Sequence, residues 1–357
     1  MGVLTKSLRG YRPWGIGHDR YSRLSAEENA TSRKLGGVLN YQHVPVLAQE
    51  VIELLCWRQG GIYVDATVGG GGHARLVLDA VGTEARLVAF DQDPVALDAA
   101  REMLQDKADQ IIFIGSNFVH LYSILTERQL LPIDGILFDL GVSSPQLDVA
   151  QRGFSYRYDA PLDMRMDPQS AVTAAHLLAT LSEEELAEII AEYGEERWAK
   201  RIAKFIVLER KQSPITNTGH LVDVIKAAIP AGARRRGPHP ARRTFQALRI
   251  AVNRELEFLK QALVDAVKVL RPNGRIAVIS FHSLEDRIVK ETFSRLAAGC
   301  QCPPDLPVCV CNRQAELEII TRKPIIPSAA ETTQNPRARS AKLRVAQKVL
   351  PDEGDEY

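Results

Sequence analysis

The fold is decided by the stretch Val64-Asp65-Ala66-Thr67-Val68-Gly69-Gly70-Gly71-Gly72-His73. An apolar run at residues 62–64 leads into it and a helical pattern at 76–81 follows, so the glycines join a buried strand to a helix. Glycine lets the main chain turn sharply and approach a ligand closely. In open parallel sheets such loops lie at the carboxyl ends of the strands, where nucleotide-like ligands bind. The stretch matches neither the dinucleotide fingerprint nor a phosphate-binding P-loop.

The same alternation of strand and helix continues along the chain. Near-continuous apolar runs are typical of a parallel sheet that is covered by helices on both faces. We predict further strands at residues 87–90, 111–114, 135–138 and 275–279, and two final strands at 317–320 and 343–349. The first and third of these runs end at Asp91 and Asp139. An acid at the end of the second strand can accept both hydroxyl hydrogens of a ribose, so the glycine loop and Asp91 together favour a nucleoside-containing cofactor.

A helical module interrupts this α/β pattern. The sequence predicts an irregular segment at residues 143–168. It predicts successive helices at residues 171–230, with a capping box at Ser182 and Glu185, and one long helix at residues 244–270. The predicted organisation is an irregular arm at 1–40, an α/β domain in two parts at 41–142 and 244–350, a helical insert at 143–243, and an acidic tail at 351–357.

Composition bounds the class of protein. The 357 residues are 45% hydrophobic and 25% charged with a formal net charge of +1, which is ordinary for a globular chain. No run approaches the roughly 18 apolar residues of a membrane span. The arm carries Lys6, Arg9 and Arg12 without a following apolar segment, so it does not resemble a secretory signal. We expect a cytoplasmic protein, with organellar import through the arm left open.

Eight strings carry a close resemblance to a known family. They are Tyr41-Gln42-His43-Val44-Pro45-Val46-Leu47, Asp139-Leu140-Gly141-Val142-Ser143-Ser144-Pro145-Gln146-Leu147-Asp148, Arg152-Gly153-Phe154-Ser155, Pro161-Leu162-Asp163-Met164-Arg165-Met166-Asp167, Tyr193-Gly194-Glu195-Glu196-Arg197, Arg243-Thr244-Phe245-Gln246-Ala247, Ser280-Phe281-His282-Ser283-Leu284-Glu285-Asp286-Arg287 and Asn335-Pro336-Arg337-Ala338-Arg339-Ser340. In this order they resemble the bacterial ribosomal small-subunit RNA (cytosine-N4)-methyltransferase family, RsmH or MraW. The chain differs from that family in the long arm before Tyr41.

The resemblance implies a Rossmann-like class I methyltransferase sheet with an inserted all-helical domain. It implies S-adenosylmethionine as methyl donor and the N4 amine of a small-subunit ribosomal RNA cytosine as target. By motif, the residues that look like cofactor contacts are Gly71, Gly72, His73, Asp91, Phe118, Asp139 and Gln146. Two of them have plainer interpretations, since Phe118 could be a core aromatic and His73 could cap its helix. Asp139 is harder to explain without a partner, because a carboxylate at the open end of a buried strand is costly.

The groups that activate the target amine are left open. The cytosine amine is a poor nucleophile, and acceptors for its two N–H groups would favour the reactive form. The Asn/Asp-Pro-Pro-aromatic motif of DNA amino-methyltransferases is missing here, so the acceptors cannot be copied across. The candidates are Asp139, Ser143, main-chain carbonyls of the same loop, and His282, which could equally be a loop histidine satisfied by the main chain. The base within folded RNA would have to be splayed out.

Local charge indicates an RNA partner. From Glu192 to Arg254, Lys and Arg outnumber Asp and Glu by 14 to 5. The candidate RNA-binding residues are Arg234, Arg235, Arg236, Arg242, Arg243, Arg337 and Arg339, with Lys342 and Arg344 nearby. Basic runs are usually solvated surface. Two of them flank the inferred site in a chain of almost zero net charge, so we favour phosphate contacts.

The cysteine cluster allows two interpretations. Cys300, Cys302, Cys309 and Cys311 could give four thiolates to a zinc ion or form a loop of reduced cysteines.

The competing functions are a ribosome-assembly factor that has lost catalysis, and a methyltransferase acting on DNA or a small molecule. The intact glycine loop and Asp91 weigh against the first. The basic insert weighs against the second. Free RNA and an assembled subunit are both possible substrates.

Overall fold

The computed structural model describes residues 45–235, 237–299, 302, 311 and 314–350 of the chain. Clustering of contacts separates residues 1–42 from residues 43–357, and all described residues belong to the second unit. The predicted arm at 1–40 and the acidic tail at 351–357 therefore lie outside the described residues. Within the described part, no helix is both long and apolar enough to cross a membrane.

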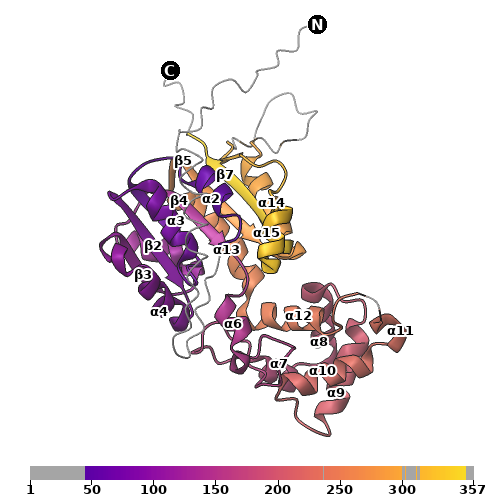
Figure 1. Cartoon of the computed structure of the whole chain (residues 1–357). Coiled ribbons are helices and arrows are strands. Elements are labelled where there is room, and N and C mark those ends of the chain that lie inside the picture. The colour runs from indigo at the N-terminus through magenta and orange to yellow at the C-terminus, as the bar shows by residue number, and fades with distance from the viewer. Residues whose placement is uncertain (1–44, 236, 300–301, 303–310, 312–313, 351–357) are drawn as a thin grey trace. The chain divides into compact units, whose positions relative to one another are not determined.

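A seven-stranded sheet forms the core of the described unit (Figure 1). Its order is β3-β2-β1-β4-β5-β7-β6, with the first five strands parallel and β7 antiparallel to both of its neighbours. The strands are β1 (Gly61–Asp65), β2 (Ala85–Asp91), β3 (Ile111–Gly115), β4 (Ile133–Asp139), β5 (Leu270–Ser280), β6 (Leu317–Ile319) and β7 (Lys342–Lys348). This confirms the predicted Rossmann-like, class I methyltransferase sheet and places both final strands where the apolar runs predicted them.

Helices cover both faces of the sheet, as the near-continuous apolar strands require. One face packs on α2 (Ala48–Leu55), α3 (Gly72–Val81) and α4 (Pro94–Met103). The other face packs on α5 (Leu121–Glu127), α13 (Glu255–Val269) and α14 (Ser283–Ala297). The remaining elements of this part are α15 (Ala329–Gln334), η2 (Gln105–Gln110), η3 (Phe118–His120) and η5 (Pro336–Ser340).

The register of the parallel strands gathers three acids at one edge. Asp65 ends β1 opposite Ala89 of β2, and Asp91 ends β2 only two positions further on. Asp139 ends β4, the strand on the other side of β1. Because carboxyl ends of parallel strands meet at the same edge, the residues that interrupt the apolar pattern lie together there.

The insert has its own hydrophobic core. Its elements are α6 (Ser144–Asp148), η4 (Ala150–Arg152), α7 (Ala174–Thr180), α8 (Glu183–Gly194), α9 (Ala199–Arg210), α10 (Thr218–Ala228), α11 (Ala231–Arg234) and α12 (Arg242–Asn253). The run of helices without strands is confirmed, as is the capping box of Ser182 and Glu185. The segment expected to be irregular at 143–168 does contain short helical turns, α6 and η4.

The single long helix predicted over residues 244–270 is wrong. The helix is interrupted at Arg254, whose φ of 51° is left-handed, and α12 and α13 lie on the two sides of this interruption. The Asn253 side chain accepts a hydrogen bond from Met166 N and donates one to Met164 O, both at 2.8 Å. These bonds fasten the end of α12 to the irregular segment of the insert. The apolar period runs on because both helices are amphipathic, yet they pack on different cores. The domain division stays a prediction, and this packing favours a boundary near Arg254.

Candidate active site at the carboxyl edge of the sheet

The glycine loop is shaped by a conformation that favours glycine. Gly71 precedes α3 with a φ of 85°, and a Cβ there would lie 3.1 Å from Leu104 Cδ1 and 3.4 Å from Ala100 Cα. At Gly70 a Cβ would meet no atom within 4 Å. The loop is therefore packed tightly on one side and open on the other, which suits close approach of a ligand to the main chain.

Asp91 connects this loop to the end of β2. Its Oδ2 accepts from Gly69 N at 3.0 Å and its Oδ1 accepts from Asp93 N at 2.9 Å. Burial raises the pKa of Asp91 to about 6, against the lowering effect of these main-chain donors. The carboxylate thus lies beside the glycine loop, where a ribose ligand is expected.

His73 points at Asp139 and does not cap its helix. Its Nε2 lies 2.9 Å from Val46 O, and its Nδ1 lies 3.3 Å from Asp139 Oδ2. A carbonyl oxygen can only accept, so Nε2 carries a proton, and the carboxylate facing Nδ1 calls for a second one. Burial lowers the pKa of His73, but the hydrogen bond and charge of Asp139 outweigh it and the net pKa shift is upward. The contact with Asp139 therefore favours the protonated form of the His73 imidazole.

Asp65 is the third acid of the edge. It is only 2% exposed, and its Oδ1 accepts from Thr67 N at 3.1 Å. Burial raises the pKa of Asp65 to about 7, opposed by the positive charge of His73. A buried carboxyl group that titrates near neutrality is more frequent at functional sites than elsewhere.

Among the described residues, two buried polar atoms at and just after the end of β4 find no hydrogen-bond partner. They are Asp139 Oδ1 and Ser143 Oγ. Buried polar groups in native proteins are rarely left without a partner, so each of these atoms calls for an explanation. Both were candidates for binding the target amine, and the fold brings them to the same loop. Their unmet bonding capacity suits a ligand that donates.

Phe118 and Gln146 make protein contacts that fit plainer roles. The half-buried Phe118 ring packs edge-on against Phe138, with 5.6 Å between the ring centroids. Gln146 is 4% exposed, its Oε1 accepts from Ser143 N, and its Nε2 donates to Asp93 Oδ2, both at 3.0 Å. Their assignment as cofactor contacts remains a prediction.

His282 lies beside the edge but its ring is turned toward α14. It is the N-cap of that helix in a reciprocal capping box with Glu285, and its Nε2 lies 3.1 Å from Glu285 Oε1 without hydrogen-bonding geometry. The plainer interpretation of His282, a loop histidine with local partners, fits this placement. A role in catalysis remains a prediction.

A buried charge network surrounds His282, and the sequence did not predict it. Glu255 and Glu285 approach His282 closely enough to resemble metal ligands. However, Arg249 Nε and Nη2 bind the two oxygens of Glu255 at 2.9 and 3.0 Å, and Glu285 Oε2 accepts from Phe281 N at 2.7 Å. With those atoms engaged, only His282 and one oxygen of Glu285 remain to bind a metal ion. The three residues are therefore better explained as an ion-pair network than as a metal site. Only the spacing of Arg249 and Glu255 around the unpredicted helix break could have signalled it.

A basic groove of about 480 Å³ begins where β5 ends. It is lined by Phe281, His282 and Ser283 of the sheet domain, by Glu195, Arg242, Arg243 and Gln246 of the insert, and by Arg339 and Lys342 near the C-terminus. Three of the predicted RNA-binding arginines therefore meet in one groove. A Cβ at Gly141 would lie 3.5 Å from Phe281 Cδ2, so the groove adjoins the loop that follows Asp139.

The other predicted RNA-binding arginines that the structure describes lie outside this groove. Arg234 lines a second hollow, of about 270 Å³, together with Trp198 and His239. Arg235 is exposed and lines neither hollow. Arg337 pairs with Asp148 at 2.7 Å, and Arg236 lies outside the described residues.

The predicted zinc ligands cannot be compared with the structure as a set. Cys302 and Cys311 belong to the described residues, whereas Cys300 and Cys309 do not. The zinc hypothesis therefore remains a prediction.

Residues 40–349 match the model of the MraW methylase family. "Ribosomal RNA small subunit methyltransferase H" of Heliobacterium mobile is 58% identical over 312 residues, which cover 87% of this chain and 100% of that protein. The protein of the same name from Brevibacillus brevis is 54% identical over 311 residues, covering 87% and 99%. Among solved structures, a SAM-dependent O-methyltransferase of Thermotoga maritima is 9% identical with a TM-score of 0.39, covering 88% of this chain and 70% of that one, a likeness too distant to bear on function.

Proposed function

Because the chain belongs to the MraW methylase family, we propose that it transfers a methyl group from S-adenosylmethionine to the N4 amine of a cytosine in small-subunit ribosomal RNA. The relatives that carry the name of a ribosomal small-subunit methyltransferase match over nearly their whole length. The observation that carries the chemistry is Asp139, whose buried Oδ1 finds no hydrogen-bond partner in the part of the chain that the structure describes and whose strand ends beside the glycine loop.

The residues of the edge fit such a donor. The open side of the loop at Gly70 admits a ligand, and Asp91 stands ready for a ribose. When bound, the cofactor supplies an electrophilic methyl group on a sulfonium. The chain's task is then to hold the two reactants in one geometry, which can supply a large part of the rate acceleration.

Asp139 and Ser143 are the groups that would hold the target amine. The nitrogen lone pair is delocalised into the cytosine ring, and hydrogen bonds from its N–H groups to Asp139 Oδ1 and Ser143 Oγ would favour the pyramidal form. Methylation releases one proton from the nitrogen, which the Asp139 carboxylate can accept and pass to water. His73 occupies the other carboxylate oxygen and keeps the first one directed away from it.

The basic groove is the surface we assign to RNA phosphates. Arg242, Arg243 and Arg339 are exposed in it, and it adjoins the loop after Asp139. An RNA held there with its target cytosine splayed out could present the base to that loop.

Methyl transfer is tested with labelled donor and small subunits that lack the modification. We expect label in RNA, and nucleoside mass mapping should find N4-methylcytidine. Parallel reactions on deproteinised RNA decide between free RNA and the assembled subunit as substrate. Tight binding of both without any transfer would replace the enzyme with an assembly factor.

The groove is tested by replacing Arg242 and Arg243 together with alanine. RNA binding should weaken, and the slope of log affinity against log salt should become shallower by about 2, because two fewer phosphate contacts release counterions. Replacing Lys200 and Lys204 together is the matched control, since both are exposed on α9, line neither hollow and change the net charge equally. Equal effects of the two pairs on the slope would contradict the groove.

Zinc binding by the four cysteines and a cytoplasmic location stay predictions. Neither is needed for the chemistry proposed above.

A further inference from the structure

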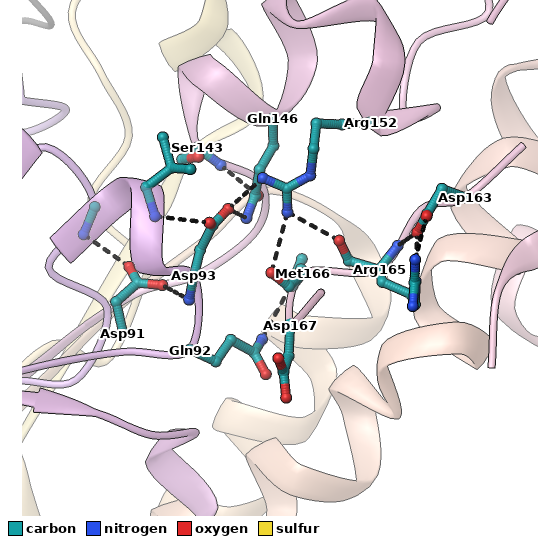
Figure 2. A network of polar contacts seen from close by, with 12 residues as sticks. Asp91, Gln92, Asp93, Ser143, Gln146, Arg152, Asp163, Arg165, Met166 and Asp167 are labelled. Atoms are coloured by element: carbon teal, nitrogen blue, oxygen red, sulfur yellow. Dashed lines mark hydrogen bonds and ion pairs between the residues drawn. The ribbon is translucent and has the colours of Figure 1, made fainter. Parts of the chain in front are cut away.

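Figure 2 shows a buried carboxylate, Asp93, that joins three segments of the chain. Asp93 is 1% exposed and follows Asp91 at the end of β2. Its Oδ1 caps α4 by accepting from Val95 N at 3.1 Å. Its Oδ2 is not needed for the cap. That oxygen accepts instead from Gln146 Nε2 at 3.0 Å and from Arg152 Nη1 at 2.7 Å.

Arg152 extends the connection into the insert. While Nη1 binds Asp93, Nη2 donates to Arg165 O at 2.9 Å and to Met166 O at 3.0 Å. Met166 N in turn donates to Asn253 Oδ1, next to the helix break. Figure 2 shows the contacts of Arg152 with Asp93, Arg165 and Met166. One arginine therefore ties the end of β2 to the irregular segment on which the insert's last helix rests.

Gln146 extends the connection toward the chemistry. Its Oε1 accepts from Ser143 N at 3.0 Å, so the main chain at Ser143 is fixed to Asp93 through one side chain. On the other side, Asp93 N donates to Asp91 Oδ1 at 2.9 Å. A continuous line of hydrogen bonds thus runs from the ribose acid to the loop that faces the target base.

The energetics single out the ion pair as the strongest link of this line. A buried carboxylate is costly unless it is paired and hydrogen-bonded, and breaking such a pair leaves an uncompensated charge. Charge-assisted bonds are also roughly twice as strong as neutral ones. Losing Arg152 therefore loosens Asp93 Oδ2, and with it the anchor of Gln146.

We propose that Arg152 and Asp93 are positioning residues for methyl transfer, whose ion pair holds the Ser143 loop, through Gln146, opposite the cofactor acid Asp91. The inference rests on the proposed function. It gives Gln146 a role in holding the loop, with both ends of its amide already engaged by the protein. A displacement of about 1 Å in such a loop can cost on the order of 10² in rate.

The test compares Arg152→Met with Arg58→Met. Arg58 pairs with Asp134, another buried carboxylate, at the opposite end of the sheet, so the control removes an arginine–carboxylate contact away from the site while Arg271 still faces Asp134. We expect Arg152→Met to lower kcat on the order of 10²-fold while the Kd for S-adenosylmethionine changes less than about threefold, because Asp91 keeps its bond from Gly69 N. Arg58→Met should keep kcat within about twofold.

Arg152→Lys separates positioning from simple loss of stability. The ammonium can still bind Asp93, but its point charge lacks the fork that reaches Arg165 O and Met166 O. We expect partial recovery of kcat, by about tenfold over Arg152→Met, even if the two variants have similar melting temperatures. This variant also serves if Arg152→Met fails to fold.

Hydrogen exchange at the Ser143 amide gives a readout that does not need activity. We expect exchange about tenfold faster in Arg152→Met than in wild type and unchanged in Arg58→Met. Unchanged kcat and unchanged exchange in Arg152→Met would overturn this inference alone, as would a loss of kcat matched by Arg58→Met. A wild-type protein that transfers no methyl group to any RNA would overturn the proposed function, and the catalytic part of this inference with it.

Discussion

Strand β4 carries a carboxylate at each end, and the two have opposite surroundings. Asp134, at the amino end, is fully buried, with Arg58 and Arg271 each 3.0 Å from its Oδ1 and with Ile62 N donating to its Oδ2 at 2.8 Å. Asp139, at the carboxyl end, has one oxygen against His73 and one to which no described residue donates a hydrogen bond. The difference teaches that burial and charge alone do not mark a site. What distinguishes Asp139 from Asp134 is a carboxylate oxygen that accepts no hydrogen bond from the described residues, whereas both oxygens of Asp134 accept one.

The chain closes around Asp134 down to the backbone. A Cβ on Gly61 would lie 2.2 Å from Asp134 Oδ2, so only glycine leaves room for the carboxylate there. No comparable enclosure is found at Asp139, whose side chain is 19% exposed. One end of the strand is therefore built to hold an acid in place, and the other to offer it.

The sharpest test of this contrast is Asp139→Asn. Transfer should fall on the order of 10²–10³-fold, because the amide offers a weaker acceptor to the target amine and cannot take its proton. RNA affinity should stay close to wild type, since the basic groove is untouched. Single-turnover rates and filter binding measure the two. A rate within threefold of wild type would remove Asp139 from the chemistry.

Asp91→Ala should have the next largest effect. We expect S-adenosylmethionine to bind about 1.5–3 kcal/mol more weakly, the worth of hydrogen bonds to a charged acceptor. Calorimetry on wild type and variant measures the change. If affinity held while the melting temperature fell, Asp91 would resemble Asp134 and the contrast would be confined to β4.

Asp134→Asn should reverse the pattern of Asp139→Asn. We expect a loss of about 1–3 kcal/mol in the free energy of unfolding, because Arg58 and Arg271 lose their shared anion. Transfer by the folded protein should be nearly unchanged. Urea titration and single-turnover rates report the two quantities. A large loss of rate at unchanged stability would show that both ends of β4 serve the reaction.

The last expected effect is a gradual dependence of stability on pH. Burial raises the pKa of Asp65 to about 7 and that of Asp91 to about 6, well above the value of 3.8 for a free carboxyl. The native state then binds more protons than the unfolded state, so the ligand-free protein loses stability as pH rises from about 4 to 7. Asp65→Asn should flatten this decline. Urea titrations at pH 5 and pH 8 compare the variants, and an identical slope in Asp65→Asn would contradict the prediction.

The sequence predicted the sheet well because its signals are local. Apolar runs that stop at Asp91 and Asp139 define both a strand and the edge where it ends. The helix break at Arg254 was missed because both sides of it are amphipathic, and no Pro or Gly marks it. What broke the helix is tertiary, namely the contacts of Asn253 with the main chain around Met164 and Met166.

The site was predicted in its parts more than in its connections. The glycine loop, Asp91 and Asp139 were singled out as candidates because each interrupts an apolar pattern, and the fold brings them to one edge of the sheet. Arg152 was visible only as part of a motif, and its bond to Asp93 depends on how the insert packs. Arg337, which is predicted to bind RNA, also pairs with Asp148, and a basic run does not reveal which of its members have such partners. Ion pairs between distant segments leave no periodic signal.

The position of β7 has a consequence for how the chain is made. This strand is the last element of the described residues, yet it lies between β5 and β6. A nascent chain that has not yet released residues 342–348 leaves β5 with an unpaired edge, open to wrong partners. The insert, whose helices from α7 to α10 follow one another closely along the chain, can fold before β7 is available to the sheet. The sheet is therefore complete only after the last part of translation. A message truncated before Lys342 should yield an aggregating product.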